Sequence, residues 1–175
     1  MGSHLPGECA EGPVLSMDNT LPPSASKVQA ALAAAGLDAR VVVRLLPTRT
    51  AEEAAAACGC AVAQIVKSLV FRGAESQRPY LFLVSGKNRV IERGFAALLG
   101  ERLERPDADF VRLVTGYAIG GIPPLGLATA MQTLMDQDLL AFDTVWAAAG
   151  TPNAVFPVAP AKLQQAAGAR LVSMT

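Results

Sequence analysis

Histidine is almost missing from this chain of 175 residues, and its scarcity limits the chemistry that the protein can perform. The single histidine, His4, belongs to residues 1–4, whose sequence resembles the remnant of an expression tag. Without another imidazole, catalysis by a Ser-His-Asp or Cys-His arrangement is excluded, as is hydrolysis at a histidine-bound metal. Any reaction must therefore depend on backbone donors, lysine, carboxylates, hydroxyl groups and water.

Cysteines and long apolar runs are also scarce. The three cysteines, Cys9, Cys58 and Cys60, are too few for a disulfide framework. A zinc site at Cys58 and Cys60 would need two more ligands, and only His4 and Cys9 remain, so we expect no metal and no cofactor. No apolar run reaches the roughly 18 residues of a membrane span, and no secretory signal is visible. These absences favour a cytoplasmic protein.

Charge of either sign is limited and balanced, with 15 Lys and Arg against 15 Asp and Glu, which is unusual for a tight nucleic-acid binder. The distribution is uneven, because residues 62–112 hold nine basic and six acidic residues, whereas residues 113–161 hold no Lys or Arg. The middle segment has the positive excess needed to meet a phosphate backbone. On charge alone, however, a solvated surface is the better interpretation.

The pattern of apolar residues predicts one domain over residues 23–175, after a leader at residues 1–22 whose composition is typical of disorder. β-Branched and apolar runs predict strands over residues 40–46, 64–72, 80–85, 133–136, 144–148, 155–158 and 170–173. Short helices are predicted over residues 95–99, 107–114 and 160–167. We therefore expect an α/β or α+β domain around a mixed sheet.

Two longer helices have start and stop signals. Ser24 or Ser26 is expected to cap a helix that ends at Gly36. Thr50 and Glu53 have the spacing of a capping box, which predicts a second helix from residue 51 to about residue 58.

A lysine interrupts the apolar strand predicted over residues 64–72. Burial of this charge would cost free energy unless the ammonium group faces water or a partner. Lys67 could lie on the outward face of an edge strand, where lysines are common. It could instead open into a cleft and bind a phosphate or a carboxylate. The strand sequence leaves both interpretations open.

Residues 116–126 form a loop, because four glycines and two adjacent prolines cannot sustain a helix or a central strand. Glycines let a ligand approach the backbone, and successive N–H groups can form an anion-binding nest or an oxyanion hole. The alternative is a tight structural turn, since Gly and Pro are the usual turn residues. Asp136, further along, is better suited to accept hydrogen bonds from loop amides than to pair with Asp138.

These segments together resemble the YbaK family of editing domains associated with prolyl-tRNA synthetase. The resemblance runs from residue 26 to the C-terminus and includes residues 50–54, 64–71, 115–117, 124–126, 136 and 149–154. It implies a mixed α/β fold with a barrel-like central sheet flanked by helices. It also implies hydrolysis of the ester that joins an amino acid to the terminal ribose of tRNA, by an enzyme that stands alone and acts in trans.

The resemblance also implies residue roles. The family lysine corresponds to Lys67, and the glycine-rich motif corresponds to Gly116, Gly120, Gly121, Pro124 and Gly126. We hypothesise that backbone N–H groups from residue 120 to residue 126 hold the carbonyl oxygen of the ester. Lys67 would hold the terminal phosphate or polarise the ester. The expected catalytic residues are Lys67, Gly120, Gly121 and Gly126, and the expected substrate-binding residues are Ser68, Thr115, Gly116, Pro124 and Asp136.

The sequence departs from some relatives at the site. Ser68 stands where some carry Asn or Thr, Pro123 stands where some carry Ser, and the pocket histidine of some relatives is missing. These departures affect the amino-acid specificity more than the reaction. The family acts on small amino acids, and the hydroxyl groups of Ser68 and Thr115 favour serine or threonine slightly over alanine or cysteine.

The expected partners are the acceptor end of aminoacyl-tRNA, with tRNA(Pro) among the carriers, and an aminoacyl-tRNA synthetase. One alternative is a module that binds the 3′ end of aminoacyl-tRNA without cleaving it. Another is a small-molecule hydrolase or sensor unrelated to RNA, which would show no salt dependence typical of tRNA binding.

Overall fold

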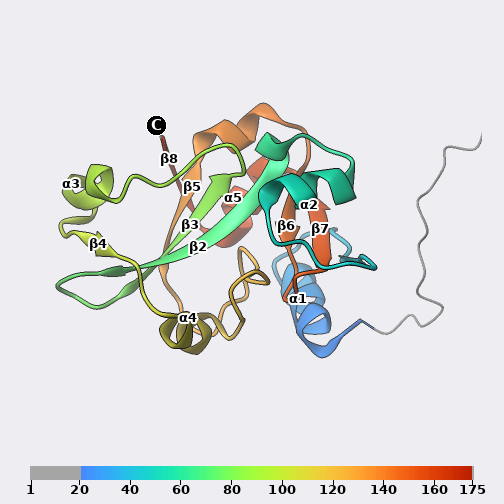
Figure 1. Ribbon diagram of the computed structural model, residues 1–175, viewed down its shortest axis with the longest axis horizontal. Coiled ribbons are helices and arrows are strands. Elements are labelled where there is room, and N and C mark those ends of the chain that lie inside the picture. The colour runs from blue at the N-terminus through green and yellow to red at the C-terminus, as the bar shows by residue number, and fades with distance from the viewer. Residues whose placement is uncertain (1–20, 175) are drawn as a thin grey trace, which may run out of the picture.

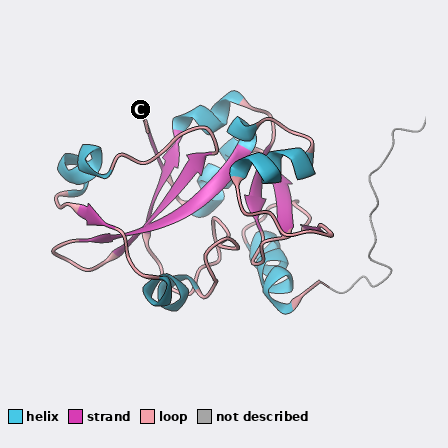
Figure 2. Ribbon diagram, viewed as in Figure 1, coloured by secondary structure: helices cyan, strands magenta, loops and turns pink. Residues whose placement is uncertain are grey.

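An open, mixed sheet runs through the middle of the molecule, and helices pack around it (Figure 1 and Figure 2). The computed structural model describes residues 21–174. The strands are β1 (Val42–Val43), β2 (Ile65–Gly73), β3 (Pro79–Ser85), β4 (Leu103–Glu104), β5 (Gln132–Asp136), β6 (Val145–Ala148), β7 (Ala154–Val158) and β8 (Arg170–Val172). The helices are α1 (Pro23–Ala34), α2 (Ala51–Cys58), α3 (Ala96–Leu99), α4 (Ala108–Thr115) and α5 (Pro160–Ala167).

The sheet has the strand order β1-β7-β6-β2-β3-β5-β8, with β4 also paired to β2. β2 pairs antiparallel with β3 and parallel with β6, whereas β5 pairs parallel with both β3 and β8. The prediction of a single α/β domain with a mixed sheet is confirmed. The expectation of a barrel-like sheet is wrong, because the short strands β1 and β8 end the sheet and do not pair with each other within residues 21–174.

The free edge of β2 is the feature of the sheet that matters most for the site. β2 pairs with β6 only at Ile65 and Val66, and with β4 only at Arg72 and Gly73. Between these contacts, in the part of the chain that the structure describes, no strand pairs with this edge over residues 67–71. A strand edge without a neighbour presents main-chain donors and acceptors to whatever lies beside it.

Helix boundaries follow local signals with one exception. Thr50 caps α2 by accepting a hydrogen bond from the backbone N–H of Glu53 at 3.1 Å, as predicted. The Glu53 carboxylate accepts from the backbone N–H of Arg49 and not from that of Thr50, so the reciprocal part of the capping box is shifted by one residue. The predicted serine cap of α1 is wrong, because the helix already begins at Pro23, whose missing N–H costs nothing in a first turn.

The strand predicted over residues 40–46 is reduced to Val42–Val43. After it, the chain bonds to a turn and not to a strand: Arg44 N–H donates to the Asn153 carbonyl at 2.7 Å, and Thr48 N–H donates to the Pro152 carbonyl at 3.0 Å. The length of β1 is therefore set by the segment that it bonds to, and the β-branched sequence alone does not determine it.

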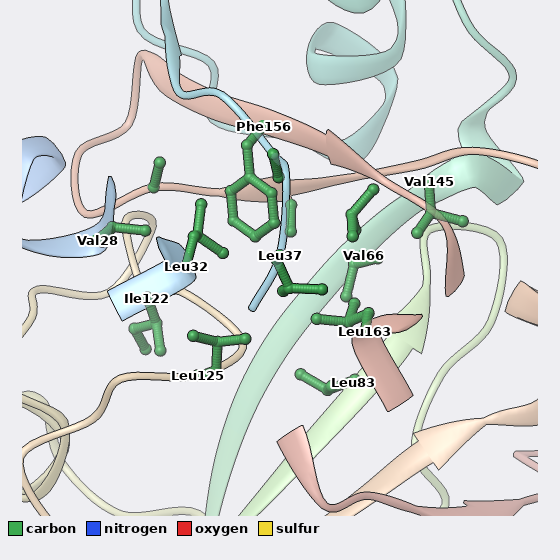
Figure 3. Close-up of a cluster of buried hydrophobic side chains, with 14 of the residues drawn as sticks. Val28, Leu32, Leu37, Val66, Leu83, Ile122, Leu125, Val145, Phe156 and Leu163 are labelled. Atoms are coloured by element: carbon green, nitrogen blue, oxygen red, sulfur yellow. The ribbon is translucent and has the colours of Figure 1, made fainter. Parts of the chain in front are cut away.

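The larger apolar core joins α1, the sheet and the loop at residues 116–126, which we call the glycine loop. Figure 3 shows Ile122 and Leu125 of this loop beside Val28 and Leu32 of α1, in one cluster with Phe156 of β7. All of these side chains are buried. The glycine loop is thus a packed part of the core with one surface turned toward the site.

Three earlier expectations concern segments for which the structure gives only partial information. Residues 1–20 of the predicted leader, with His4 and Cys9, lie outside the described residues. Within residues 21–174, no group of three or more His, Cys, Asp and Glu side chains is arranged to hold a metal ion. None of the described helices combines the length and the apolar character that a membrane crossing requires.

Candidate active site

A cavity of about 270 Å³ opens between the N-terminus of α2, the free edge of β2, strands β6 and β7, and the glycine loop. We call it the first cavity. Many of its walls are alanines or backbone, which leaves a small and largely apolar space. Its lining includes Arg49, Thr50, Ala51, Ala54, Lys67, Ser68, Ile119, Gly120, Ile122, Trp146, Ala147, Ala148 and Thr151.

Lys67 lies half-buried on β2, opposite Val84 of β3. Its ammonium group donates a hydrogen bond to the backbone carbonyl of Asn88 at 2.5 Å. Burial lowers the pKa of Lys67 from the ordinary value of 10.5, and the positive charge of Arg89 lowers it further, while Glu52 and Asp136 act in the opposite direction. Lys67 therefore lies on the unpaired part of the β2 edge and lines a cavity, as the second of the two interpretations requires.

Ser68, the next residue, also lines the first cavity. Its Oγ atom is shut off from solvent and has no hydrogen-bond partner among the described residues. A buried hydroxyl without a partner costs free energy. Ser68 thus lines the first cavity and carries a hydroxyl whose hydrogen-bonding capacity is unused among the described residues.

The glycine loop contributes only some of the backbone groups that its sequence suggested. Gly120, with φ +97°, lines the first cavity, and so does Ile122. No hydrogen bond within the described residues uses the backbone N–H of either one. The N–H of Gly121, by contrast, donates to the Ala118 carbonyl at 3.1 Å and is therefore occupied by the turn.

The remaining glycines of the loop meet other parts of the chain. A Cβ atom at Gly121 would lie 2.7 Å from the Gly150 carbonyl oxygen, and one at Gly126 would lie 2.6 Å from Ala31 Cβ in α1. Gly116, with φ +82°, ends α4. None of these three residues lines the cavity. Gly121 and Gly126 let the loop pack closely, and Gly116 lets α4 end.

Thr115 and Pro124 are buried and do not line the first cavity. The Thr115 hydroxyl lies 2.7 Å from the Val111 carbonyl oxygen and accepts a hydrogen bond from the Tyr117 N–H at 3.0 Å. These contacts join the end of α4 to the start of the glycine loop. The hydroxyl is thus engaged by its own backbone neighbours.

Asp136 is fully buried at the end of β5 and organises the loop that holds Lys67. Its carboxylate accepts hydrogen bonds from Ser85 N–H at 3.1 Å, Asn88 Nδ2 at 2.8 Å and Asp138 N–H at 3.0 Å. Asn88 in turn offers its carbonyl oxygen to Lys67. Asp136 therefore acts on the cavity through Asn88, and it fixes amides as the sequence suggested.

Several lining residues were not singled out from the sequence. Arg49 and Thr50 belong to the N-terminus of α2, and Trp146 belongs to β6. The capping signal at Thr50 located the helix start, but no local signal indicated that this start faces Lys67. Only the pairing of β6 with β2 brings Trp146 to the same cavity.

The comparison with known proteins was made against this geometry. The profile of the aminoacyl-tRNA editing domain matches residues 46–166. The chain belongs to this family. Its match spans the first cavity, including Lys67, Ser68 and the glycine loop. The family supports aminoacyl-tRNA deacylation as the general activity of this site.

Individual relatives agree with the family. The chain is 31% identical over 116 residues to the uncharacterized protein YwhH of Bacillus subtilis (strain 168), covering 66% of this chain and 73% of the relative. It is 46% identical, with a TM-score of 0.84, to a proposed trans-editing enzyme for prolyl tRNA synthetase, covering 89% of this chain and 99% of the other. Hypothetical protein APE2540 is 31% identical with a TM-score of 0.78, covering 84% of this chain and 97% of the other.

Proposed function

We propose that this protein is a trans-acting hydrolase that removes a small amino acid from mischarged tRNA. The observation that carries the proposal is the placement of Lys67, a half-buried cation at a small apolar cavity. Ser68, Gly120 and Ile122 line the same cavity, and no hydrogen bond among the described residues uses the N–H groups of Gly120 and Ile122. The family match supports the reaction class. The size of the cavity supports a small aminoacyl group, since about 270 Å³ lies below the range of sites for drug-sized ligands.

The proposed reaction needs no histidine. Water adds to the carbonyl carbon of the aminoacyl ester, and the negative charge that develops on the carbonyl oxygen is stabilised by the backbone N–H groups of Gly120 and Ile122. The bond from the carbonyl carbon to the ribose oxygen then breaks, and the ribose oxygen takes up the proton released by the water. The products are the free amino acid and uncharged tRNA. Loss of one such oxyanion donor typically costs about 10²–10³ in rate.

Within this reaction we assign Lys67 to the ester. Its ammonium group would polarise the ester or hold the phosphate of the terminal nucleotide. Of the residues predicted to be catalytic, Lys67 and Gly120 line the cavity, so these two have direct roles in the proposal. Gly121 and Gly126 would act by shaping the loop, and Asp136 would act by holding Asn88 against Lys67.

For the substrate we propose serine or threonine first, with alanine and cysteine next. A partnerless hydroxyl at Ser68 suits a substrate that can hydrogen-bond, and such pockets discriminate strongly against analogues without the group. Thr115 no longer supports this preference, because its hydroxyl is engaged by the backbone. The similarity to a proposed trans-editing enzyme for prolyl tRNA synthetase supports tRNA(Pro) as a carrier and that synthetase as the source of the error.

The test is a deacylation time course on tRNA charged in turn with alanine, cysteine, serine, threonine and proline. Wild type is compared with Lys67→Ala and with Lys162→Ala, which removes an exposed lysine of α5 away from the cavity. We expect release of one or two small amino acids, a loss of about 10²-fold or more in Lys67→Ala, and no change in Lys162→Ala. If the protein binds charged tRNA but releases no amino acid, it is a binding module and not an enzyme. If it neither binds charged tRNA nor releases an amino acid, its activity is unrelated to tRNA.

A further inference from the structure

A second cavity, of about 380 Å³, lies along the same free edge of β2. Its lining includes residues 67–71 of that edge, Arg89, Arg105, Val111 of α4, and Ile119 and Ile122 of the glycine loop. The proposed reaction makes no use of most of these residues. Three of the lining side chains are basic, and none of the lining residues is acidic.

The positive charge around the second cavity is poorly neutralised. Arg105 pairs with Glu92 at 2.8 Å, but its side chain remains 79% exposed. Arg89 is exposed and has no carboxylate within 4.0 Å among the described residues. Lys67 stands near enough to Arg89 for the two charges to repel each other. A bound anion would relieve this repulsion and would be attracted by all three cations.

The two cavities adjoin each other. They share Lys67, Ser68 and Leu69 on one side and Ile119 and Ile122 on the other. Ile119 is 63% exposed, although it is a large apolar residue, and it stands at the boundary between the two spaces. An extended ligand that follows the edge of β2 would therefore pass from one cavity to the other beside Lys67.

We propose that the second cavity binds the last nucleotides of the tRNA 3′ end, with Arg89 and Arg105 on their phosphates. This inference rests on the proposed function, because the first cavity then holds the aminoacyl group. The chemistry of the two cavities decides which part of the ligand each one holds. The smaller, alanine-lined cavity suits the small amino acid, and the larger cavity with basic residues suits the nucleotides. The apolar side chains of Leu69, Val111 and Ile119 offer surfaces for nucleobases.

The first test measures binding without turnover. The probe is a fluorescently labelled, uncharged RNA hairpin with a CCA 3′ end, titrated with the full chain at several salt concentrations. We expect Arg89→Ala and Arg105→Ala each to weaken binding about tenfold, as for the loss of a charged hydrogen bond. The slope of log K against log salt should fall by about 0.7 for each phosphate contact that is lost.

Matched variants separate this role from a general effect of charge. Arg170→Ala removes an exposed arginine of β8, which lines neither cavity, and should leave the affinity unchanged. Glu92→Gln frees Arg105 from its ion pair and should keep or tighten the binding. Equal weakening by Arg170→Ala, or unchanged binding and salt slope in both Arg89→Ala and Arg105→Ala, would overturn the proposal.

The second test uses two minimal esters of the preferred amino acid, one on adenosine and one on adenosine 5′-monophosphate. In wild type, the 5′-phosphate should lower KM with little effect on kcat. This decrease in KM should vanish in the double variant that carries both Arg89→Ala and Arg105→Ala. An advantage that persists in the double variant would place the phosphate elsewhere. If neither the esters nor the charged tRNAs are cleaved, the proposed function fails, while the hairpin titration still decides whether the second cavity binds the tRNA end.

Discussion

Ser68 has a hydroxyl group that is sealed from solvent and unpaired among the described residues. Such a group lowers the stability of the free protein, and its retention is understandable if a ligand supplies the missing hydrogen bond. At the same scale, Lys67 is held in place by a backbone carbonyl, which leaves the other N–H bonds of its ammonium group available to a ligand. Lys67 and Ser68, which are neighbours on β2, thus both line the first cavity.

Substitution of Ser68 by alanine separates substrate choice from stability. We expect the free energy of unfolding to stay equal or to rise by up to about 1 kcal/mol, because an unpaired buried hydroxyl is removed. Deacylation of seryl- and threonyl-tRNA should fall relative to alanyl-tRNA. Urea denaturation and the deacylation panel measure the two effects.

Ser85→Ala is the matched control for this prediction. Ser85 Oγ donates to the Ala63 carbonyl at 2.7 Å, so its removal should destabilise the protein by about 1 kcal/mol. A destabilised Ser68→Ala with an unchanged order of substrates would mean that Ser68 has a structural role only.

At the scale of elements, the glycine loop owes its position to close contact with α1. Ile122 and Leu125 are buried against this helix, and Gly126 approaches it so closely that a Cβ atom would collide with Ala31. Gly120 and Ile122 line the first cavity while the neighbouring part of the loop is fixed against α1 in this way. The geometry of the proposed oxyanion site is therefore a consequence of helix packing.

Gly126→Ala tests this packing. Gly126 has φ +71°, and the added Cβ would lie 2.6 Å from Ala31 Cβ. We expect a loss of about 2–4 kcal/mol in the free energy of unfolding, from left-handed strain together with overpacking. Gly36→Ala, at φ +76° with no atom within 4 Å of the added Cβ, should lose only the strain, about 1–2 kcal/mol.

Ala31→Gly combined with Gly126→Ala provides a rescue. The helical glycine costs about 1 kcal/mol by itself, yet it removes the atom that the new methyl group meets. The double variant should therefore be more stable than the sum of the two single effects predicts. Simple additivity in urea denaturation would show that the contact carries no strain.

Local signals predicted the elements well and their assembly less well. The cap at Thr50 and the helix from Pro160 to Ala167 depend on neighbours in sequence, so they were visible in it. The length of β1 depends on a turn more than 100 residues away, as the Thr48–Pro152 contact shows. For the same reason, Lys67 could be singled out from the sequence, whereas the approach of Arg89 and Trp146 to its cavities could not.

At the scale of the whole molecule, Glu101 ties the β2–β3 turn to the segment before β4. Its carboxylate accepts hydrogen bonds from Glu75 N–H, from the N–H and hydroxyl of Ser76, and from the Tyr80 hydroxyl. The hydrogen bonds from Ser76, followed by those from Tyr80 and Glu75, lower the pKa of Glu101 from 4.5 to about 2. The ionised carboxylate is thus favoured in the folded state.

The sign of the resulting pH dependence follows from proton uptake. Below pH 4.5 the unfolded chain protonates Glu101 first, so the stability that this group provides is full above pH 4.5 and is lost as the pH falls to about 2. We expect Glu101→Gln to be less stable than wild type at neutral pH, with the difference shrinking across this window. Denaturation curves at several pH values measure it.

Glu75→Gln is the control, because its exposed side chain makes none of these contacts while its backbone N–H remains. Its stability should follow the wild-type pH dependence. If the stability of Glu101→Gln depends on pH in the same way as that of wild type, the proposed role of this carboxylate is wrong.

The contact between α1 and the glycine loop also determines which segment of the chain could be moved into another protein with its site intact. The family profile covers residues 46–166 and so contains every side chain that lines the first cavity, but it leaves out α1. A fragment cut at residue 46 would keep those groups and lose the surface on which Ile122 and Leu125 rest. The segment that must be transferred to another protein is therefore longer than residues 46–166, and α1 is the part of it that supports the glycine loop.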